Sequence, residues 1–336
     1  MMKMTPSLVE LMVRFELAGF QIRIVGGAVR DHVLGIKPKD IDLCTDATPD
    51  QMKVLADRNQ YGFVPTGVDH GTVTLIVNHE LFEVTTLRQD VDTDGRRATV
   101  EFTTSFEDDA ARRDLTINAM SMDLTGHVFD YFGGLADLDN KIVRFVGDAN
   151  QRVAEDYLRI LRYFRFAARG FTFDMNELTA VTDTVNLNGL KQVSVERYWM
   201  EMQKLVVSVD ADRVLEMMHY TGVLNALGLS KPSMPVKGLD SVSALSTMLT
   251  PDTLPEFLAK WKLSSDEARK LMFLVNTLPI RGTDDVKLML LDDVPADWVR
   301  MKVVLGRFNG TSLVDFVETW VVPAFPVNGQ DLLDLG

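Results

Sequence analysis

A strand, a glycine pair and a short helix follow one another near the N-terminus and constrain the fold more than any other stretch. Residues 22–25, Ile-Arg-Ile-Val, are typical of a buried β-strand. Gly26 and Gly27 end that strand, and residues 28–34 are predicted to form a helix. Backbone N–H groups at such a turn favour a bound anion, and Arg30 lies one helical turn further on. The spacing matches neither GxGxxG nor GxxxxGK(S/T), so a Rossmann or P-loop site is not indicated, and a purely structural turn is the alternative.

Two aspartates follow in a segment that alternates polar and apolar residues, 40–44. In a strand, Asp40 and Asp42 project from the same face, where their like charges repel. A divalent cation relieves that repulsion, and Mg²⁺ is commonly held by one or two carboxylates together with substrate phosphates. An anion-binding turn beside such a pair predicts a nucleoside triphosphate with Mg²⁺. An edge strand with exposed acids is the alternative, and Glu83 is a candidate third carboxylate.

Basic residues gather in one part of an acidic chain. The net charge is −13, yet residues 151–170 contain five arginines and two acids. Four of these arginines are three, three and four residues apart, so one continuous helix would place them on one side. They are Arg159, Arg162, Arg165 and Arg169. The apolar residues expected to pack into a core are Ile160, Leu161, Phe164 and Ala167. A solvated helix with ordinary ion pairs is the alternative.

Composition excludes several classes of protein. Apolar residues make up 46% and charged residues 25% of the 336 residues, which is typical of globular proteins of two or three domains. The single cysteine, Cys44, excludes an internal disulfide and predicts a reducing compartment, the cytoplasm. The histidines form no paired zinc pattern, and no run of about 18 apolar residues predicts a membrane span.

The middle of the first half is predicted to alternate strands and polar segments. Residues 72–77 and 81–87 alternate in the manner of strands from the same sheet. Residues 90–102 are polar and contain glycine, which predicts a mobile loop. Ser105 is predicted to cap the next helix through the backbone N–H of Asp108.

Four segments, in order, resemble the class II tRNA nucleotidyltransferase and bacterial poly(A) polymerase family. They are residues 24–45, 83–123, 130–169 and 193–206. The loop in the second segment looks most like the CCA-adding branch of alphaproteobacteria and mitochondria. The resemblance implies an α+β fold, in which a polymerase beta-like mixed-sheet head is followed by helices. The implied domains are a catalytic head at 1–135, a base-recognising helical neck at 136–205, and a helical body with a truncated tail at 206–336 that binds tRNA.

The resemblance also implies a role for each matching residue. Asp40 and Asp42 would be the catalytic carboxylates that hold two Mg²⁺ ions. The implied nucleotide-binding residues are Gly26, Gly27, Arg30, Arg113, Asp114, Glu155, Asp156, Arg159, Arg162 and Arg165. In the family's EDxxR motif, Asp156 and Arg159 would read the Watson–Crick edge of the base, which accepts C and A and rejects U and G. Residues 193–206 would steady this part of the neck, with Ser194 as a helix cap.

The implied reaction is template-independent addition of CCA to the 3′ end of tRNA from CTP and ATP, with release of pyrophosphate. Partial CC-adding or A-adding activity, a poly(A) polymerase and a catalytically silent RNA-binding relative are the alternatives. The full-length loop between residues 88 and 104 argues against the CC-adding form. Residues 325–336 resemble a segment after which relatives continue, so a shortened tail is expected. The oligomeric state and the tRNA contacts of the helical half are not predicted.

Overall fold

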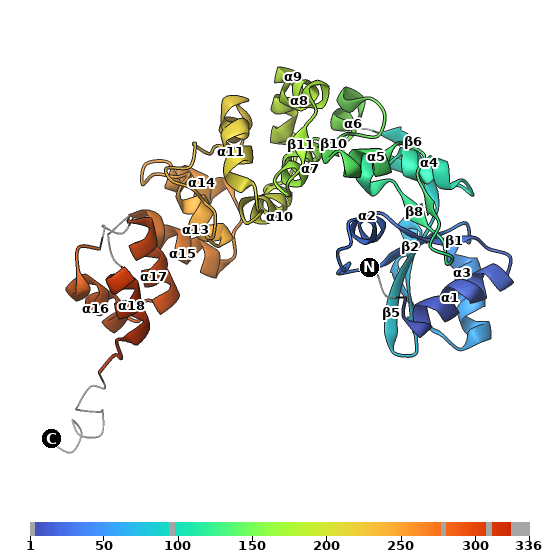
Figure 1. Ribbon diagram of the computed structural model, residues 1–336, viewed down its shortest axis with the longest axis horizontal. Coiled ribbons are helices and arrows are strands. Elements are labelled where there is room, and N and C mark those ends of the chain that lie inside the picture. The colour runs from blue at the N-terminus through green and yellow to red at the C-terminus, as the bar shows by residue number, and fades with distance from the viewer. Residues whose placement is uncertain (1–3, 94–97, 277–279, 307–310, 324–336) are drawn as a thin grey trace, which may run out of the picture. The chain divides into compact units, whose positions relative to one another are not determined.

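The chain divides into two compact units, Met1–Leu227 and Gly228–Gly336. The computed structural model describes residues 4–93, 98–276, 280–306 and 311–323, with the backbone alone at 90–93, 98–100 and 311. The predicted α+β class is confirmed, because a mixed sheet opens the first unit and helices form most of the remainder (Figure 1). The expected head, neck and body borders stay predictions.

A seven-stranded sheet with the order β3-β4-β5-β2-β1-β8-β9 forms the centre of the N-terminal part. Its strands are β1 (Ile22–Val25), β2 (Asp42–Thr45), β3 (Gly62–Gly67), β4 (Thr72–Val77), β5 (Glu80–Thr86), β8 (Ser121–Met122) and β9 (Val128–Phe129). β2 runs parallel to β5, and the other pairs are antiparallel. The strands predicted at 22–25 and 72–77 are confirmed, and β5 lies within one residue of its predicted bounds.

One face of this sheet is apolar and the other carries the acids. Ile24, Leu43, Val84 and Val73 lie in register across four strands and are fully buried. Helices α1 (Pro6–Leu17) and α3 (Pro49–Asn59) pack on the sheet (Figure 1). Asp42 of β2 pairs with Glu83 of β5, one position before the Leu43 and Val84 pair, and both acids are exposed. Because neighbouring positions of a strand point to opposite faces, the apolar row turns both acids away from the core.

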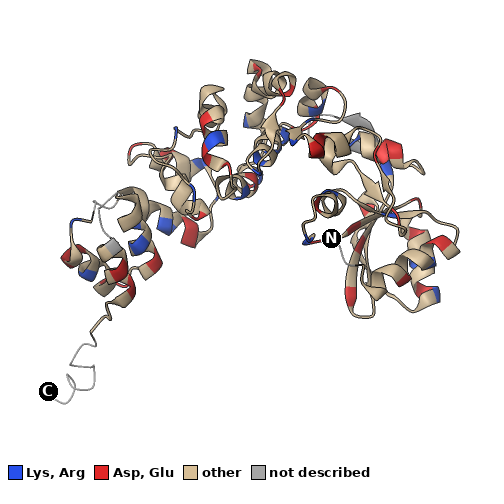
Figure 2. Ribbon diagram, viewed as in Figure 1, with Lys and Arg blue, Asp and Glu red and all other residues tan. Residues whose placement is uncertain are grey.

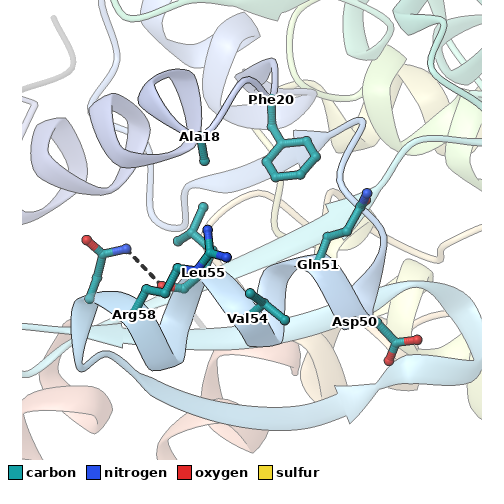
Figure 3. A pocket seen from close by; sticks show the side chains of 8 residues that line it. Ala18, Phe20, Asp50, Gln51, Val54, Leu55 and Arg58 are labelled. Atoms are coloured by element: carbon teal, nitrogen blue, oxygen red, sulfur yellow. Dashed lines mark hydrogen bonds between the residues drawn. The ribbon is translucent and has the colours of Figure 1, made fainter.

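A separate groove of about 320 Å³ lies between the end of α1 and the outer surface of α3. The ring of Phe20 points toward α3, where Val54 and Leu55 line the groove and the exposed Arg58 borders it (Figure 3). This groove shares no residue with the pocket described below.

The polar segment predicted as a loop over 90–102 is largely a hairpin. β6 (Arg88–Thr93) pairs antiparallel with β7 (Ala98–Phe102), and residues 94–97 lie outside the described part. The prediction of a loop is therefore wrong for the paired residues, because backbone hydrogen bonds between strands do not depend on side-chain polarity. The helix after it, α4 (Phe106–Ala111), begins as predicted, with the Ser105 hydroxyl accepting from the Asp108 N–H at 3.1 Å.

Helices then follow to the end of the first unit. They are α2 (Gly27–Val33) within the sheet region, and then α5 (Gly134–Asp139), α6 (Ala149–Glu155), α7 (Leu158–Ala167), α8 (Met175–Thr182), α9 (Thr184–Gly189), α10 (Val195–Val206), α11 (Ala211–Tyr220) and α12 (Val223–Ala226). Two short parallel strands, β10 (Ile142–Val143) and β11 (Thr172–Phe173), lie among them. The predicted core face of α7 is confirmed, since all four residues are fully buried: Ile160, Leu161, Phe164 and Ala167.

The single helix predicted over residues 151–170 is wrong. α6 ends at Glu155, and Asp156 has an extended backbone with φ −158° and ψ 103°. The Asp156 carboxylate accepts a hydrogen bond from the Leu158 N–H at 3.1 Å, which starts α7 as a new helix. A side chain that bonds to a nearby backbone donor competes with helix continuation, and the arginine spacing does not reveal it. Arg169 lies in the turn after α7.

Glu177 of α8 is a buried carboxyl that should make the fold sensitive to pH. Burial raises the pKa of Glu177 to about 7, and a hydrogen bond from the Phe145 N–H opposes this shift only in part. Because the folded pKa lies above the unfolded one, stability is lost as pH rises from about 4.5 through 7. We expect Glu177→Gln to raise the free energy of unfolding by about 3 kcal/mol at pH 8 and to change little near pH 4. Urea unfolding at both pH values measures this, and an equal gain at the two would contradict it.

The described residues of the second unit form helices and connecting turns. The helices are α13 (Ser241–Ser246), α14 (Leu254–Lys260), α15 (Ser265–Asn276), α16 (Thr283–Leu291), α17 (Ala296–Leu305) and α18 (Thr311–Thr319). Helices α16, α17 and α18 share a core of buried side chains. Its members are Ile280, Val286, Leu290, Val299, Val303 and Val317. Within the described ranges, no helix is both long and apolar enough to cross a membrane. The C-terminal segment 325–336 lies outside the described residues.

Candidate active site

A cavity of about 480 Å³ in the first unit collects most of the predicted site residues. Those that line it are Gly26, Gly27, Arg30, Asp42, Arg113, Asp114, Asp156, Arg159, Arg162 and Arg165. Two predicted residues do not line the cavity. Asp40 is exposed just before β2, and Glu155 forms an ion pair with Arg159 outside the cavity lining. Four further residues line the pocket. Arg169 was expected on the same side as the other arginines and Phe166 at the wall of the base pocket, whereas Arg112 and Asn118 were not predicted.

Positive charge dominates the lining of this pocket. Seven arginines face three aspartates, although the whole chain is acidic. Several of these arginines follow α7 and its C-terminal turn, where Figure 2 shows Lys and Arg in blue. Such a lining suits a polyanionic ligand, because guanidinium groups form charge-assisted, often bidentate, bonds to phosphate oxygens.

The glycine turn allows two arginines to approach the backbone closely. Gly26 has φ +68°, a left-handed conformation that favours glycine. A Cβ at Gly26 would lie 2.9 Å from Nη1 of Arg113, and one at Gly27 would lie 3.5 Å from Nη2 of Arg30. The N–H of Gly26 already donates to the carbonyl of Met120 at 3.1 Å. The absence of a side chain at Gly26 therefore leaves room for the Arg113 guanidinium at the pocket wall, whereas the distance at Gly27 is an ordinary van der Waals contact.

Gly26→Ala should disturb the site as well as the fold. Gly35 is the matched control, since it has φ +71° but no atom within 4 Å of an added Cβ. We expect both alanine variants to lose about 1–2 kcal/mol of unfolding free energy from backbone strain. Only Gly26→Ala should also displace Arg113 and weaken binding of the nucleotide that the resemblance implies, with CTP as the probe, about tenfold or more. Thermal unfolding and CTP titration of the two variants test this, and equal CTP affinities would contradict it.

Arg30 is a buried arginine fixed from two sides. Its Nη1 donates to the Asn118 side-chain oxygen at 2.6 Å, and its Nε and Nη2 donate to Asp31 at 2.9 and 2.7 Å. Burial lowers the pKa of Arg30, and the bonds to Asp31 oppose this. The Asn118 amide also donates to Asp114 at 3.3 Å, so Asn118 connects two predicted site residues. Nothing in the local sequence distinguishes this asparagine.

Asp109 holds Arg112 and Arg113, the two arginines that precede Asp114 in the sequence motif RRD. This buried carboxylate accepts from Arg112 at 2.6 Å and from Arg113 at 2.9 Å, one on each oxygen. Burial alone would raise the pKa of Asp109, but the two neighbouring arginines outweigh it and lower the pKa. Asp109 was not predicted, yet its spacing of three and four residues from Arg112 and Arg113 is the signal that points to it.

Acids from other elements fix the arginines of α7. Arg159 pairs with Glu155 of α6 at 2.6 Å, and Arg162 pairs with Asp114 at 2.6 Å. Glu155 thus acts on the pocket through Arg159 and does not line it.

Helix α10 supplies two more partners that the site prediction missed. Arg197 donates to both oxygens of Asp156, at 3.2 and 2.6 Å, and the buried Glu201 pairs with Arg165. These contacts agree with the supporting role expected for residues 193–206. Ser194 occupies the N-cap position of α10, but its side chain makes no capping hydrogen bond.

Asp42 is the one predicted metal ligand that lines the pocket. Although the residue is exposed overall, partial desolvation raises the pKa of Asp42; Arg113 opposes the shift and Asp40 adds to it. Glu83 faces Asp42 across parallel strands, but the described residues contain no ready group of three metal-ligating side chains. The pocket lining therefore contains Asp42, while Glu83 lies beside it on the neighbouring strand without lining the pocket.

Comparison with known proteins identifies the family of the chain. Residues 22–144 match the family "Poly A polymerase head domain", and residues 170–230 match "Probable RNA and SrmB- binding site of polymerase A". The mouse mitochondrial CCA tRNA nucleotidyltransferase 1 is 38% identical over 99% of this chain and 82% of its own length. The chain belongs to the CCA-adding tRNA nucleotidyltransferase family. It is a nucleotidyltransferase enzyme with the α+β fold that the resemblance implied.

Other family members extend the similarity. The CCA-adding enzyme of Streptococcus gordonii is 36% identical over 90% of this chain and 78% of its own length. The crystal structure of the Bacillus stearothermophilus CCA-adding enzyme in complex with CTP superimposes with a TM-score of 0.78 at 25% identity. That match covers 98% of this chain and 88% of the other. Both units of the chain therefore lie within the fold of the family.

Proposed function

We propose that this enzyme adds CCA to the 3′ end of tRNA without a nucleic-acid template, from CTP and ATP, and releases pyrophosphate. The observation that carries the proposal is one pocket that contains Asp42, the RRD motif and the EDxxR residues Asp156 and Arg159. Membership of the CCA-adding family supports the same substrates.

Asp40 and Asp42 fit a divalent cation, and we place Mg²⁺ there. Carboxylate oxygens are its preferred protein ligands, and desolvation together with the charge of Asp40 raises the pKa of Asp42, a cost that a bound cation removes. When bound, Mg²⁺ would lower the pKa of the tRNA 3′-hydroxyl and offset charge on the departing pyrophosphate.

The triphosphate is bound by arginines whose positions are already fixed. Arg30 is anchored by Asp31 and Asn118, and Arg113 by Asp109. Because these partners hold the guanidinium groups before the substrate arrives, little side-chain freedom is lost on binding. The N–H of Gly26 is engaged, so the turn contributes backbone contacts from Gly27 onward.

Base choice is made by Asp156 and Arg159 at the pocket wall. A carboxylate accepts from the exocyclic amine that cytosine and adenine share, and a guanidinium donates to a ring nitrogen or oxygen. Uracil and guanine present a carbonyl in place of that amine, so the carboxylate rejects them. Arg197 and Glu155 hold the two readers in place from outside the pocket.

Incubation with tRNA that lacks its 3′ CCA, and with each labelled nucleotide, tests the proposal. CTP alone should add two residues, CTP with ATP should complete CCA, and UTP and GTP should add none. Incorporation of only C or only A with both substrates present would indicate a partial enzyme. A long A tract would indicate a poly(A) polymerase, and no incorporation a silent RNA-binding relative. The hairpin segment between residues 88 and 104 favours the complete reaction over CC addition alone.

The compartment is a further part of the proposal. The single cysteine favours a reducing environment such as the cytoplasm, and the mouse, zebrafish and human relatives are mitochondrial enzymes. Fractionation of the native cells would decide between these places.

A further inference from the structure

Six of the seven pocket arginines are already ion-paired within the chain. The pairs are Arg30 with Asp31, Arg112 and Arg113 with Asp109, Arg159 with Glu155, Arg162 with Asp114, and Arg165 with Glu201. Arg169 is the exception, because its exposed guanidinium has no carboxylate partner among the residues that the structure describes. Its recorded side-chain contact is with the ring of Phe166, whose centroid lies 5.7 Å away.

Backbone hydrogen bonds fix the turn that carries Arg169. The N–H of Arg169 donates to the carbonyl of Phe166 at 3.0 Å. The carbonyl of Ala168 accepts from the N–H of Asp210 at 2.9 Å, at the start of α11. The Arg169 side chain therefore extends from a hydrogen-bonded turn into the pocket lining. A fixed backbone of this kind positions a binding side chain before the ligand arrives.

Arg169 shares the buried Phe166 ring with two other cations. The guanidinium carbons of Arg165 and Arg30 lie 4.4 and 5.1 Å from the ring centroid. Arg165 and Arg30 are neutralised by their acids, whereas Arg169 is not. Desolvation is the largest cause that lowers the pKa of Arg30, and the charge of Arg169 adds to it. The uncompensated positive charge of the pocket is thus concentrated beside Arg30.

We propose that Arg169 binds a phosphate of the incoming nucleotide's triphosphate, next to Arg30. The inference rests on the proposed function, which supplies a nucleoside triphosphate as substrate. A phosphodiester of the tRNA 3′ end has the same chemistry and is the competing source. The ring shared with Arg30 favours the triphosphate, because the Arg30 guanidinium lies next to Gly27 of the turn that is proposed to bind it.

Equilibrium binding of CTP and of tRNA to three variants tests this assignment. Arg169→Gln removes the charge, Arg169→Lys keeps it, and Arg58→Gln removes an exposed arginine on α3 beside the groove of Figure 3. We expect Arg169→Gln to bind CTP about tenfold more weakly, as for the loss of one charge-assisted hydrogen bond. Arg169→Lys should recover most of the affinity, and Arg58→Gln should match the unmodified chain. The affinity for tRNA should be unchanged in all three.

Two results would overturn the inference. One is equal CTP affinity of Arg169→Gln and the unmodified chain, and the other is a loss of tRNA affinity with CTP binding intact. Both are read from binding alone, so they are separate from the incorporation assay that tests the proposed function. A parallel rise in KM for CTP and ATP with unchanged kcat would support a binding role for Arg169 over a structural one.

Discussion

Asp42→Ala should abolish nucleotide addition, with a fall in kcat/KM of about 10³-fold or more for both CTP and ATP. Asp42 is the predicted metal-binding carboxylate that lines the pocket, and Arg113 offsets only part of the desolvation that raises its pKa. Metal-assisted stabilisation of transition-state charge is worth several kcal/mol, which corresponds to an effect of that size. Single-turnover incorporation of labelled CMP into tRNA that lacks CCA measures it.

The loss of activity should occur without a loss of stability. Since desolvation and the charge of Asp40 raise the pKa of Asp42, the ionised side chain opposes folding at neutral pH, and alanine should leave the melting temperature unchanged or higher. Asp50→Ala is the matched control, because Asp50 is an exposed aspartate on α3 that borders only the groove of Figure 3. That control should retain full activity. Asp42→Ala with more than about a tenth of the original rate would exclude Asp42 as the essential carboxylate.

Local signals sufficed for the parts of the site that are formed by neighbouring residues. The strand at 22–25, the turn at Gly26 and Gly27 and the following helix are read from consecutive residues, and the structure has them within one residue. The pairing of Asp42 with Glu83 required only that two alternating segments become adjacent strands. These features depend on side-chain periodicity and glycine conformation, which a single sequence displays directly.

Contacts between distant segments could not be read in the same way. The arginine spacing after residue 151 predicted one helix, but Asp156 interrupts it and is held by Arg197, which lies 41 residues further on. Asn118 and Glu201 are likewise ordinary residues in their own segments and become parts of the site only when other elements meet them. The sequence pointed to ten of the residues that line the pocket, whereas Asn118, Arg197 and Glu201, which hold them in place, were found only in the fold.

The proposed role of Arg159 in base selection can be tested separately from its ion pair, because its acid partner lies outside the pocket. Glu155 pairs with two arginines, Arg152 at 2.8 Å and Arg159 at 2.6 Å. Only Arg159 lines the pocket, so Arg152→Ala removes an ion pair to the same acid without removing the proposed base reader. The two alanine variants therefore form a matched pair.

Arg159→Ala should relax base choice more than it slows CMP transfer. A side chain that reads a base edge is worth about 1–3 kcal/mol of discrimination, so the preference for CTP over UTP should fall about ten- to a hundredfold. Asp156→Ala should act in the same direction, because it removes the acceptor for the exocyclic amine. Arg152→Ala should keep the original preference. Competition between CTP and labelled UTP or GTP on tRNA that lacks CCA measures the ratio. Full rejection of UTP and GTP by Arg159→Ala would mean that the base is selected elsewhere in the pocket, and that the arginine serves only to hold α6 against α7.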